Sequence, residues 1–324
     1  MADALAQIHQ AVLGHEAFLL VAHKDADADS LGSVLAFADY LGREGKSVYP
    51  WVPDPLPRGL AYLPGYEAVN QREAPADAIA ITFDAGSPSR FGNLRERIAR
   101  APLTIVIDHH ASNEGFGDLS LVQPEVAATG VIVFQALRSW GAHVSPEAAT
   151  NLYAAIFTDT GGFRHDNTTG PVLQLGADLA TLGADPAWVA LKSYKSRPET
   201  TLKLQALASA ATNYELDGRL VWSQVTVEML QQSGADLEES EGIIDILQSL
   251  DTMLCAVLFK EASGELTRVS VRSRGPIEAH ELVGPFGGGG HRRAAGAEVH
   301  GTIAEVKTAV LSEARRLIIG AVPL

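Results

Sequence analysis

Short apolar runs alternate with segments of helical spacing through the first half of the chain. Three apolar runs have the length of strands buried on both faces of a parallel sheet, at residues 18–22, 78–83 and 103–107, and a further strand is expected at 47–52. Apolar residues recur with helical spacing at 30–42, 130–140, 146–157 and 172–182, and residues 1–18 have an amphipathic helical pattern. This alternation predicts an α/β fold with an open, mostly parallel sheet and helices on both faces.

The pattern changes after residue 182. Residues 186–211 have helical spacing that is interrupted near Pro198. Strands are predicted at 220–226, 253–259 and 267–272, with an acidic stretch at 236–241, a helix at 242–250 and a final helix at 302–319. This block predicts a smaller second α/β domain. We expect a first domain over residues 1–190, a helical linker over 191–213 and a second domain over 214–324.

Composition and charge restrict the class of protein. With 324 residues, of which 46% are hydrophobic and 20% charged, the chain has enough apolar side chains for two cores. The net charge of −14 argues against stable binding to a long duplex, because basic residues supply most of the affinity for its phosphates. A short phosphorylated ligand is compatible with this charge if it binds in a local pocket that metal cations make positive.

Cys255 is the single cysteine, so no disulfide can form within the chain. Its apolar neighbours predict a buried thiol on a strand rather than a nucleophile. The N-terminal residues lack the pattern of a signal peptide, and no apolar run reaches the roughly 20 residues of a membrane span. We expect a cytoplasmic protein without membrane binding, and a monomer and a homodimer are both compatible with the sequence.

Acids and a histidine follow the first predicted strand. His23 ends the strand, and Asp25, Asp27 and Asp29 alternate with other residues before the next helix. This spacing can direct Asp27 and Asp29 at one centre. Asp29 could instead cap the helix, which is a common role for aspartate. Capping alone would require neither the histidine nor three acids, so we favour a binding role.

Two further strands are followed by polar residues. Asp84 comes after the run 78–83, and taken alone it is a weak indication because aspartate commonly starts a turn. Asp108, His109 and His110 follow the run 103–107, and this combination is more specific. One imidazole can bind a metal ion while the neighbouring carboxylate orients a ring.

Asp159 ends a predicted helix, and its surroundings alone do not distinguish a ligand from an ordinary helix-ending residue. Ligands of open α/β sheets bind at the carboxyl ends of the strands, where these polar segments would converge. The candidate metal ligands are His23, Asp27, Asp29, Asp84, His109 and Asp159. Carboxylates with a few imidazoles suit two divalent cations, Mn²⁺ in preference to Mg²⁺ or Co²⁺. Two such ions can bind the attacking and leaving oxygens of a phosphoryl displacement and lower the pKa of a bridging water, so the sequence favours an enzyme that hydrolyses phosphate esters.

A glycine-rich segment lies in the second predicted domain. Glycines at 287–290 allow backbone N–H groups to approach an anion closely, and a helix beginning near His291 would add its dipole. A flexible linker would not carry the His-Arg-Arg run that follows. We therefore predict a phosphate-binding site formed by Arg272, Ser273, Gly288, Gly289, Gly290, His291 and Arg292.

These segments resemble the two signatures of a known family. Residues 108–110, Asp-His-His, are similar to the signature of DHH phosphoesterases, and residues 288–291, Gly-Gly-Gly-His, with 294–296, are similar to their DHHA1 domain. The resemblance covers essentially the whole chain and points to the NrnA-like group of nanoRNases and 3′-phosphoadenosine 5′-phosphate (pAp) phosphatases. It implies a DHH domain, a DHHA1 domain and an active site in the cleft between them. The first family motif reads Pro-Asp-Gly-Asp, whereas residues 26–29 are Ala-Asp-Ala-Asp and keep both acids.

The resemblance also implies a role for each candidate. One metal ion would be bound by His23 and Asp27, the other by Asp29, His109 and Asp159, and both by Asp84. In catalysis, His110 would face the scissile phosphate and Asp108 would orient a histidine from behind. Arg272 and His291, with the glycine loop, would hold the far end of the substrate.

The leading hypothesis is a two-metal phosphoesterase that degrades short single-stranded oligoribonucleotides to mononucleotides and dephosphorylates pAp. One alternative keeps the metals but changes the substrate to a cyclic or linear dinucleotide, or to a longer single strand as in RecJ-like relatives. A second alternative is a catalytically inactive nucleotide-sensing protein, against which the intact set of ligands argues. A manganese-dependent pyrophosphatase would carry a different second domain.

Overall fold

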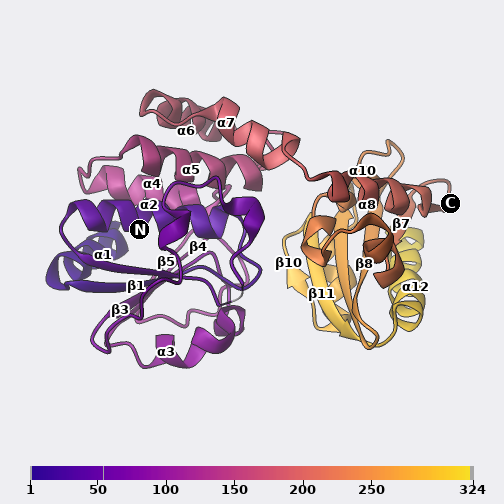
Figure 1. Ribbon diagram of the computed structural model, residues 1–324, viewed down its shortest axis with the longest axis horizontal. Helices are drawn as coiled ribbons and strands as arrows, with labels where there is room; N and C mark the ends of the chain where they lie inside the picture. Colours follow the sequence, from indigo (N-terminus) through magenta and orange to yellow (C-terminus); the bar gives the residue numbers. More distant parts are fainter. Residues whose placement is uncertain (1, 54, 322–324) are drawn as a thin grey trace. The chain divides into compact units, whose positions relative to one another are not determined.

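The computed structural model describes residues 2–53 and 55–321 and divides into two compact units (Figure 1). Unit 1 is Met1–Ser196 and unit 2 is Arg197–Leu324. Each unit contains one sheet with helices on both faces, which confirms the predicted α/β fold. Among the described residues, no helix combines the length and the apolar character needed to cross a membrane.

Unit 1 is built on a parallel sheet in the order β2-β1-β3-β4-β5. Its strands are β1 (Ala17–Val21), β2 (Ser47–Trp51), β3 (Ile79–Phe83), β4 (Thr104–Asp108) and β5 (Leu119–Val122). The first four were predicted from the sequence, and β1, β3 and β4 correspond to its apolar runs. β5 was not predicted, because it is an edge strand of 4 residues with a largely half-buried pattern.

Helices cover both faces of this sheet (Figure 1). One face packs against α1 (Ala2–Gly14), α2 (Ala28–Arg43), α4 (Thr129–Ser139) and α5 (Pro146–Asp159). The other face packs against the shorter η3 (Pro88–Leu94) and α3 (Arg95–Ala99). Successive residues of β1 enter the two cores alternately, with Phe18 and Leu20 in one and Leu19 and Val21 in the other. Burial on both faces explains why β1, β3 and β4 are nearly continuous apolar runs.

Two glycines allow the helices over unit 1 to approach closely. A Cβ added to Gly32 on α2 would lie 2.6 Å from the carbonyl oxygen of Asn151 on α5. A Cβ added to Gly130 on α4 would lie 2.6 Å from the Cβ of Ala155, also on α5. Larger side chains at either position would therefore force these helices apart.

The rest of unit 1 consists of short elements and loops. It includes η1 (Arg58–Leu60), η2 (Tyr66–Ala68), α6 (Gly170–Thr181), α7 (Pro186–Ala190) and a π-helical turn, η4 (Leu191–Lys195). In unit 2, α8 (Glu199–Ala210) buries Leu204 and Ala208 against the sheet, although this segment falls within the predicted linker.

Unit 2 contains a mixed sheet in the order β10-β11-β9-β8-β7-β6. Its strands are β6 (Asn213–Glu215), β7 (Leu220–Val225), β8 (Cys255–Ser263), β9 (Leu266–Ser273), β10 (Gly289–Gly290) and β11 (Ala294–His300). Among the described strands of this sheet, only β7 and β8 pair in parallel. Cys255 is fully buried on β8, as predicted.

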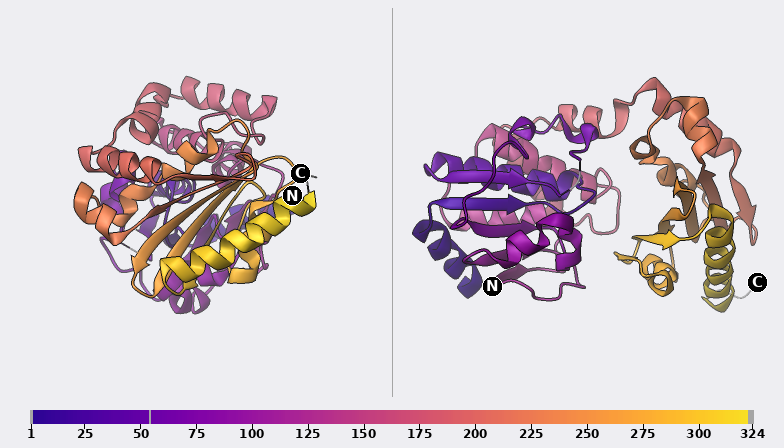
Figure 2. Two further views of the ribbon diagram at one scale, coloured as in Figure 1. Left: turned by 90° about the vertical axis from the view of Figure 1, so that its right-hand side faces the viewer. Right: turned by 60° about the horizontal axis from the view of Figure 1, so that its bottom comes forward.

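Helices also cover both faces of the second sheet. One face packs against α11 (Ala279–Val283) and the long α12 (Ile303–Ala321), which crosses the strands in Figure 2. The other face packs against α8, α9 (Val227–Ser233), η5 (Leu237–Ser240) and α10 (Ile243–Gln248). A short η6 (Gly284–Phe286) leads into the glycine-rich loop.

The prediction of a helix that begins near His291 is wrong. The chain forms a hairpin there, in which β10 and β11 pair antiparallel and the N–H of His291 donates to the carbonyl of Ala294 at 2.8 Å. Gly290 has φ +138°, a conformation that favours glycine and does not begin a helix. Pairing of β11 with β9 overrides the helical propensity of the alanines at 294 and 295.

Candidate metal centre

The structure brings the predicted metal ligands of unit 1 together. They come from the residues after β1 and β3, the start of α2, the end of β4 and the end of α5. His23, Asp27 and Asp84 form one group whose ligand atoms lie within 4.8 Å of one another, and Asp29, Asp84 and His109 form a second. Asp159 Oδ2 lies 3.7 Å from His109 Nε2, so Asp159 belongs to the second group.

Asp84 lies between the two groups. Its Oδ2 is 3.5 Å from His23 Nε2, whereas its Oδ1 is 3.4 Å from His109 Nε2. Asp84 has φ +60°, which is uncommon outside glycine, and it directly follows the buried strand β3. We name the ligands facing Oδ2, His23 and Asp27, the His23 side. Asp29, His109 and Asp159 form the His109 side.

Backbone carbonyls orient both histidine ligands. His23 Nδ1 donates to the carbonyl of Lys24 at 2.7 Å, and His109 Nδ1 donates to the carbonyl of Val126 at 3.2 Å. With the proton on Nδ1, each ring leaves Nε2, which faces the carboxylates, able to act as a metal ligand. The Lys24 carbonyl also accepts from Arg90 Nη2 at 3.1 Å.

The first two acids have different local roles. Asp27 is the N-cap of α2, where its Oδ1 accepts from the N–H of Ser30 at 2.9 Å, and its Oδ2 lies 3.8 Å from His23 Nε2. Asp29, for which the sequence left a capping role open, lies inside α2. Its carboxylate is buried and accepts from the N–H groups of Thr129 and Gly130 at 2.7 and 2.8 Å.

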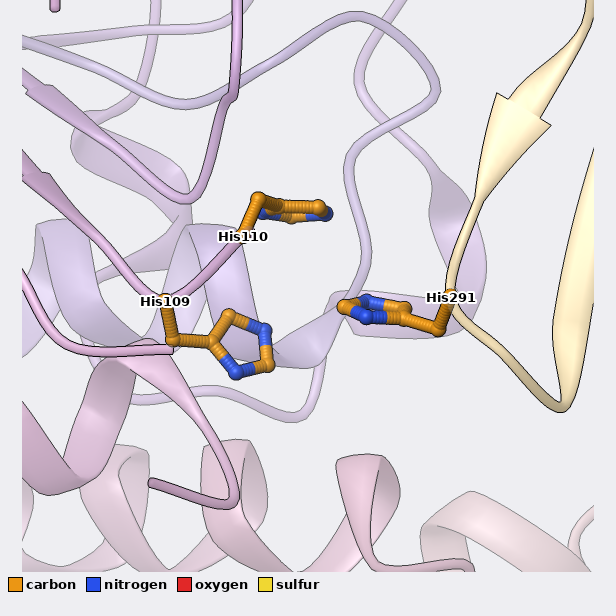
Figure 3. Close-up of side chains that lie close together, drawn as sticks. All are labelled: His109, His110 and His291. Carbon is orange, nitrogen blue, oxygen red and sulfur yellow. The ribbon is translucent and has the colours of Figure 1, made fainter. Parts of the chain in front are cut away.

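Asp108 orients His110 rather than His109. Its Oδ1 accepts from His110 Nδ1 at 2.7 Å, and its Oδ2 accepts from Asn113 Nδ2 at 2.6 Å. Figure 3 shows the rings of His109 and His110 close together at the end of β4. Their centroids lie 5.1 Å apart. Burial disfavours the cation of His110, but the hydrogen bond to Asp108 and the charges of Asp84, Asp108 and Asp159 raise its pKa to about 9.

The carboxylates of the centre repel one another. Burial raises the pKa of Asp29 well above its usual value, and the charges of Asp84 and Asp159 add to the effect. Burial and the charges of Asp84 and Asp27 likewise raise the pKa of Asp159. Burial would also raise the pKa of Asp84, but contacts with His23, His109 and His110 lower it instead. Divalent cations would relieve this repulsion, so the donor set fits metal ions.

The predicted substrate-binding residues lie in unit 2, where two of them contact acids. Arg272 on β9 has its Nε 3.8 Å from Asp245 Oδ1 on α10. Arg292 Nε lies 2.9 Å from Glu278 Oε1. Ser273 is buried, and its hydroxyl donates to the carbonyl of Arg292 at 3.1 Å. Ser273 therefore supports the loop from inside.

The glycines before His291 have different environments. A Cβ on Gly288 would lie 2.5 Å from the carbonyl oxygen of Gly296, so close packing requires glycine there. A Cβ on Gly290 would lie 2.7 Å from the carbonyl oxygen of Ala294. Gly289 is exposed, and a Cβ there would meet no atom within 4 Å. Internal packing therefore explains glycine at 288 and 290 but not at 289.

Several residues that hold the ligands in place were not predicted from the sequence. Thr129 contacts Asp29 and Asp84, Arg90 binds the carbonyl beside His23, and Asn113 binds Asp108. Asn113 and Arg90 follow candidate ligands within a few residues, and that proximity was the available indication. Thr129 lies far in sequence from both acids that it contacts, so no local pattern indicates it.

Family models match most of the chain. The model of the DHH family, N-terminal domain, matches residues 17–156, and the DHHA1 domain model matches residues 221–320. The bifunctional oligoribonuclease and PAP phosphatase NrnA of Thermus thermophilus is 32% identical over 92% of this chain and 88% of its own. The protein of the same name from Bacillus subtilis is 23% identical over 88% of this chain and 90% of its own.

A solved structure shares the fold. An exopolyphosphatase-related protein from Bacteroides fragilis superposes with a TM-score of 0.88, covers 98% of both chains and is 24% identical. The fold, the acidic and histidine-containing centre and these matches define a two-domain phosphoesterase. The chain belongs to the DHH family, with a DHHA1 domain after its N-terminal domain.

Proposed function

We propose that this phosphoesterase uses two metal ions to hydrolyse short single-stranded oligoribonucleotides to mononucleotides and to dephosphorylate pAp. The observation that carries the proposal is the position of Asp84, whose carboxylate oxygens face different groups of ligands. The substrate classes come from the names of the relatives in Thermus thermophilus and Bacillus subtilis, which are described as oligoribonuclease and PAP phosphatase.

The proposal assigns the ligands to two ions. His23, Asp27 and Asp84 would hold one ion, and Asp29, Asp84, His109 and Asp159 the other. The donors are carboxylate oxygens and imidazole nitrogens, which suit Mn²⁺ in preference to Mg²⁺ or Co²⁺. When bound, such ions lower the pKa of a water and stabilise the charge of a phosphoryl group in transfer.

The protein's own residues orient the reacting groups. Asp108 holds His110 through Nδ1, so His110 would act through Nε2 by donating a hydrogen bond to the scissile phosphate. Arg272, Arg292, His291 and the backbone at 288–290 would bind the part of the substrate away from the scissile phosphate. Ser273 would act only through the loop carbonyl that it holds.

An assay of substrate length tests the proposal. Purified protein with Mn²⁺ is incubated with 5′-labelled oligoribonucleotides of two to about two dozen residues, and with pAp in parallel. We expect kcat/KM to be highest for dinucleotides to about pentanucleotides and to fall steeply for longer substrates. The protein's net charge of −14 gives the additional phosphates of a longer oligonucleotide little further affinity. Equal efficiency on a trimer and on the longest strand would favour a RecJ-like exonuclease.

Asp84→Asn tests the two-metal assignment. It keeps the size of the side chain but removes the charge shared between the two groups of ligands. Turnover should be abolished while the circular dichroism spectrum is kept. EDTA should likewise abolish wild-type activity and Mn²⁺ should restore it. Near-normal turnover by folded Asp84→Asn protein would contradict the two-metal assignment.

A further inference from the structure

Helix α4 begins beside the metal centre, and its first residue contacts two of the candidate ligands. The N–H of Thr129 donates to Asp29 Oδ2 at 2.7 Å, and the Thr129 hydroxyl donates to Asp84 Oδ1 at 2.9 Å. A carboxylate only accepts, so the hydroxyl is the donor in the second bond. Thr129 is fully buried. Its backbone amide and its hydroxyl connect two acids that are distant in sequence.

The backbone part of this arrangement serves the helix as well. The N-cap residue of α4, Ala128, has no side chain that can accept from the first turn. Asp29 takes its place from α2 and accepts from the amides of Thr129 and Gly130. These amides cannot be removed without disturbing α4. The Thr129 hydroxyl can be removed alone, and the hydrogen bond lost with it is the one to Asp84 in the metal centre.

The hydroxyl acts on one oxygen of Asp84. Oδ1 faces His109 Nε2 at 3.4 Å, whereas Oδ2 faces His23 Nε2 at 3.5 Å. The hydrogen bond from Thr129 occupies one lone pair of Oδ1, so the remaining lone pair of that oxygen has a defined direction. The second acid that Thr129 holds, Asp29, also belongs to the His109 side.

We propose that Thr129 is a positioning residue for the cation on the His109 side of the centre. This inference rests on the two-metal function proposed above. It predicts a selective effect: loss of the hydroxyl weakens the His109-side ion and leaves the His23-side ion almost unchanged. A purely structural threonine would affect folding stability without distinguishing between the two sides.

The test measures Mn²⁺ binding directly, by titration calorimetry and by the electron paramagnetic resonance signal of free Mn²⁺. Thr129→Val removes the hydroxyl at nearly constant volume, and Thr129→Ser keeps the hydroxyl as the matched control. We expect Thr129→Val to lose about 10- to 100-fold in affinity at one of two sites, as removal of such outer partners typically does. Thr129→Ser should bind both ions as the wild type does.

A second ligand variant identifies the weakened side. His23→Gln removes a ligand of the His23 side only, so the Thr129→Val/His23→Gln double variant should bind neither ion tightly. If Thr129→Val does not fold by circular dichroism, Thr129→Ala replaces it in the same titrations. Wild-type protein that binds fewer than two Mn²⁺ ions would overturn the proposed function itself. If the wild type binds two ions, the role of Thr129 alone is overturned when Thr129→Val binds both as tightly as the wild type, or loses affinity equally at both sites.

Discussion

Asp108 and His110 form a hydrogen bond of 2.7 Å at the end of β4, with the acid fully buried behind the ring. Asn113 fixes the other oxygen of Asp108, so neither the acid nor the imidazole can rotate without losing a partner. The acid of the Asp-His-His motif thus acts on the second histidine. The first histidine is oriented by a backbone carbonyl instead.

This relationship predicts a kinetic difference between two variants. His110→Ala should lower kcat by roughly 10²-fold or more and change KM less, because a proton or hydrogen-bond donor to the phosphate acts mainly in the transition state. Asp108→Asn should lower kcat by a smaller factor, because the ring remains but is held less firmly. Steady-state kinetics on a labelled dinucleotide measure both. A change confined to KM in His110→Ala would assign His110 to substrate binding in the ground state.

A second prediction concerns Arg90 and the His23 side. Arg90→Ala removes a guanidinium whose Nη2 lies 3.1 Å from the Lys24 carbonyl and 3.1 Å from His23 Nδ1, which contacts the same carbonyl. The ring should lose part of its orientation, so we expect about 10-fold weaker Mn²⁺ binding at one site. Arg95→Ala removes the same charge from the exposed surface of α3 and is the control. Equal Mn²⁺ affinities in the two variants would contradict the prediction.

A third prediction separates two neighbouring glycines of the loop. Gly288→Ala should lower the melting temperature by several degrees, because its Cβ would lie 2.5 Å from the carbonyl oxygen of Gly296. Gly289→Ala should leave the melting temperature unchanged, because its Cβ has open space. If the substrate approaches the backbone at 289, Gly289→Ala should nevertheless raise KM several-fold. Unchanged kinetics in Gly289→Ala would place the substrate elsewhere on unit 2.

A fourth prediction concerns the thiol of Cys255. Burial raises its pKa to about 12, so a thiol reagent at pH 8 should not label native protein but should label it once denatured. Above about pH 9 the thiol is deprotonated in the unfolded protein but still protonated in the folded protein. Because this favours the unfolded state, the contribution of Cys255 to the free energy of unfolding should decrease as pH rises. Cys255→Ala should keep wild-type kcat. Rapid labelling of native protein would contradict the buried position on β8.

Much of unit 1 could be predicted because β1, β3 and β4 are buried on both faces and appear as nearly continuous apolar runs. The same topology places the residues after β1, β3 and β4 together at the carboxyl ends of the parallel strands, so a cluster of ligands could be predicted there. Strand β11 was missed because the alanines at 294 and 295 have no strand pattern, and their conformation comes from pairing with β9. Thr129 could not be predicted, because its partners are fixed only by tertiary packing.

The close approach of α2, α4 and α5 makes the metal centre sensitive to distant changes in volume. Asp29 is carried by α2 and bound by the amides of α4, and the glycines at 32 and 130 let both helices rest against α5. A single added methyl group in this layer would shift one helix against another and change the distance between Asp29 and Asp84. Catalytic rate should then be a more sensitive reporter of helix packing than thermal stability, and variants far from the substrate could be inactive while fully folded.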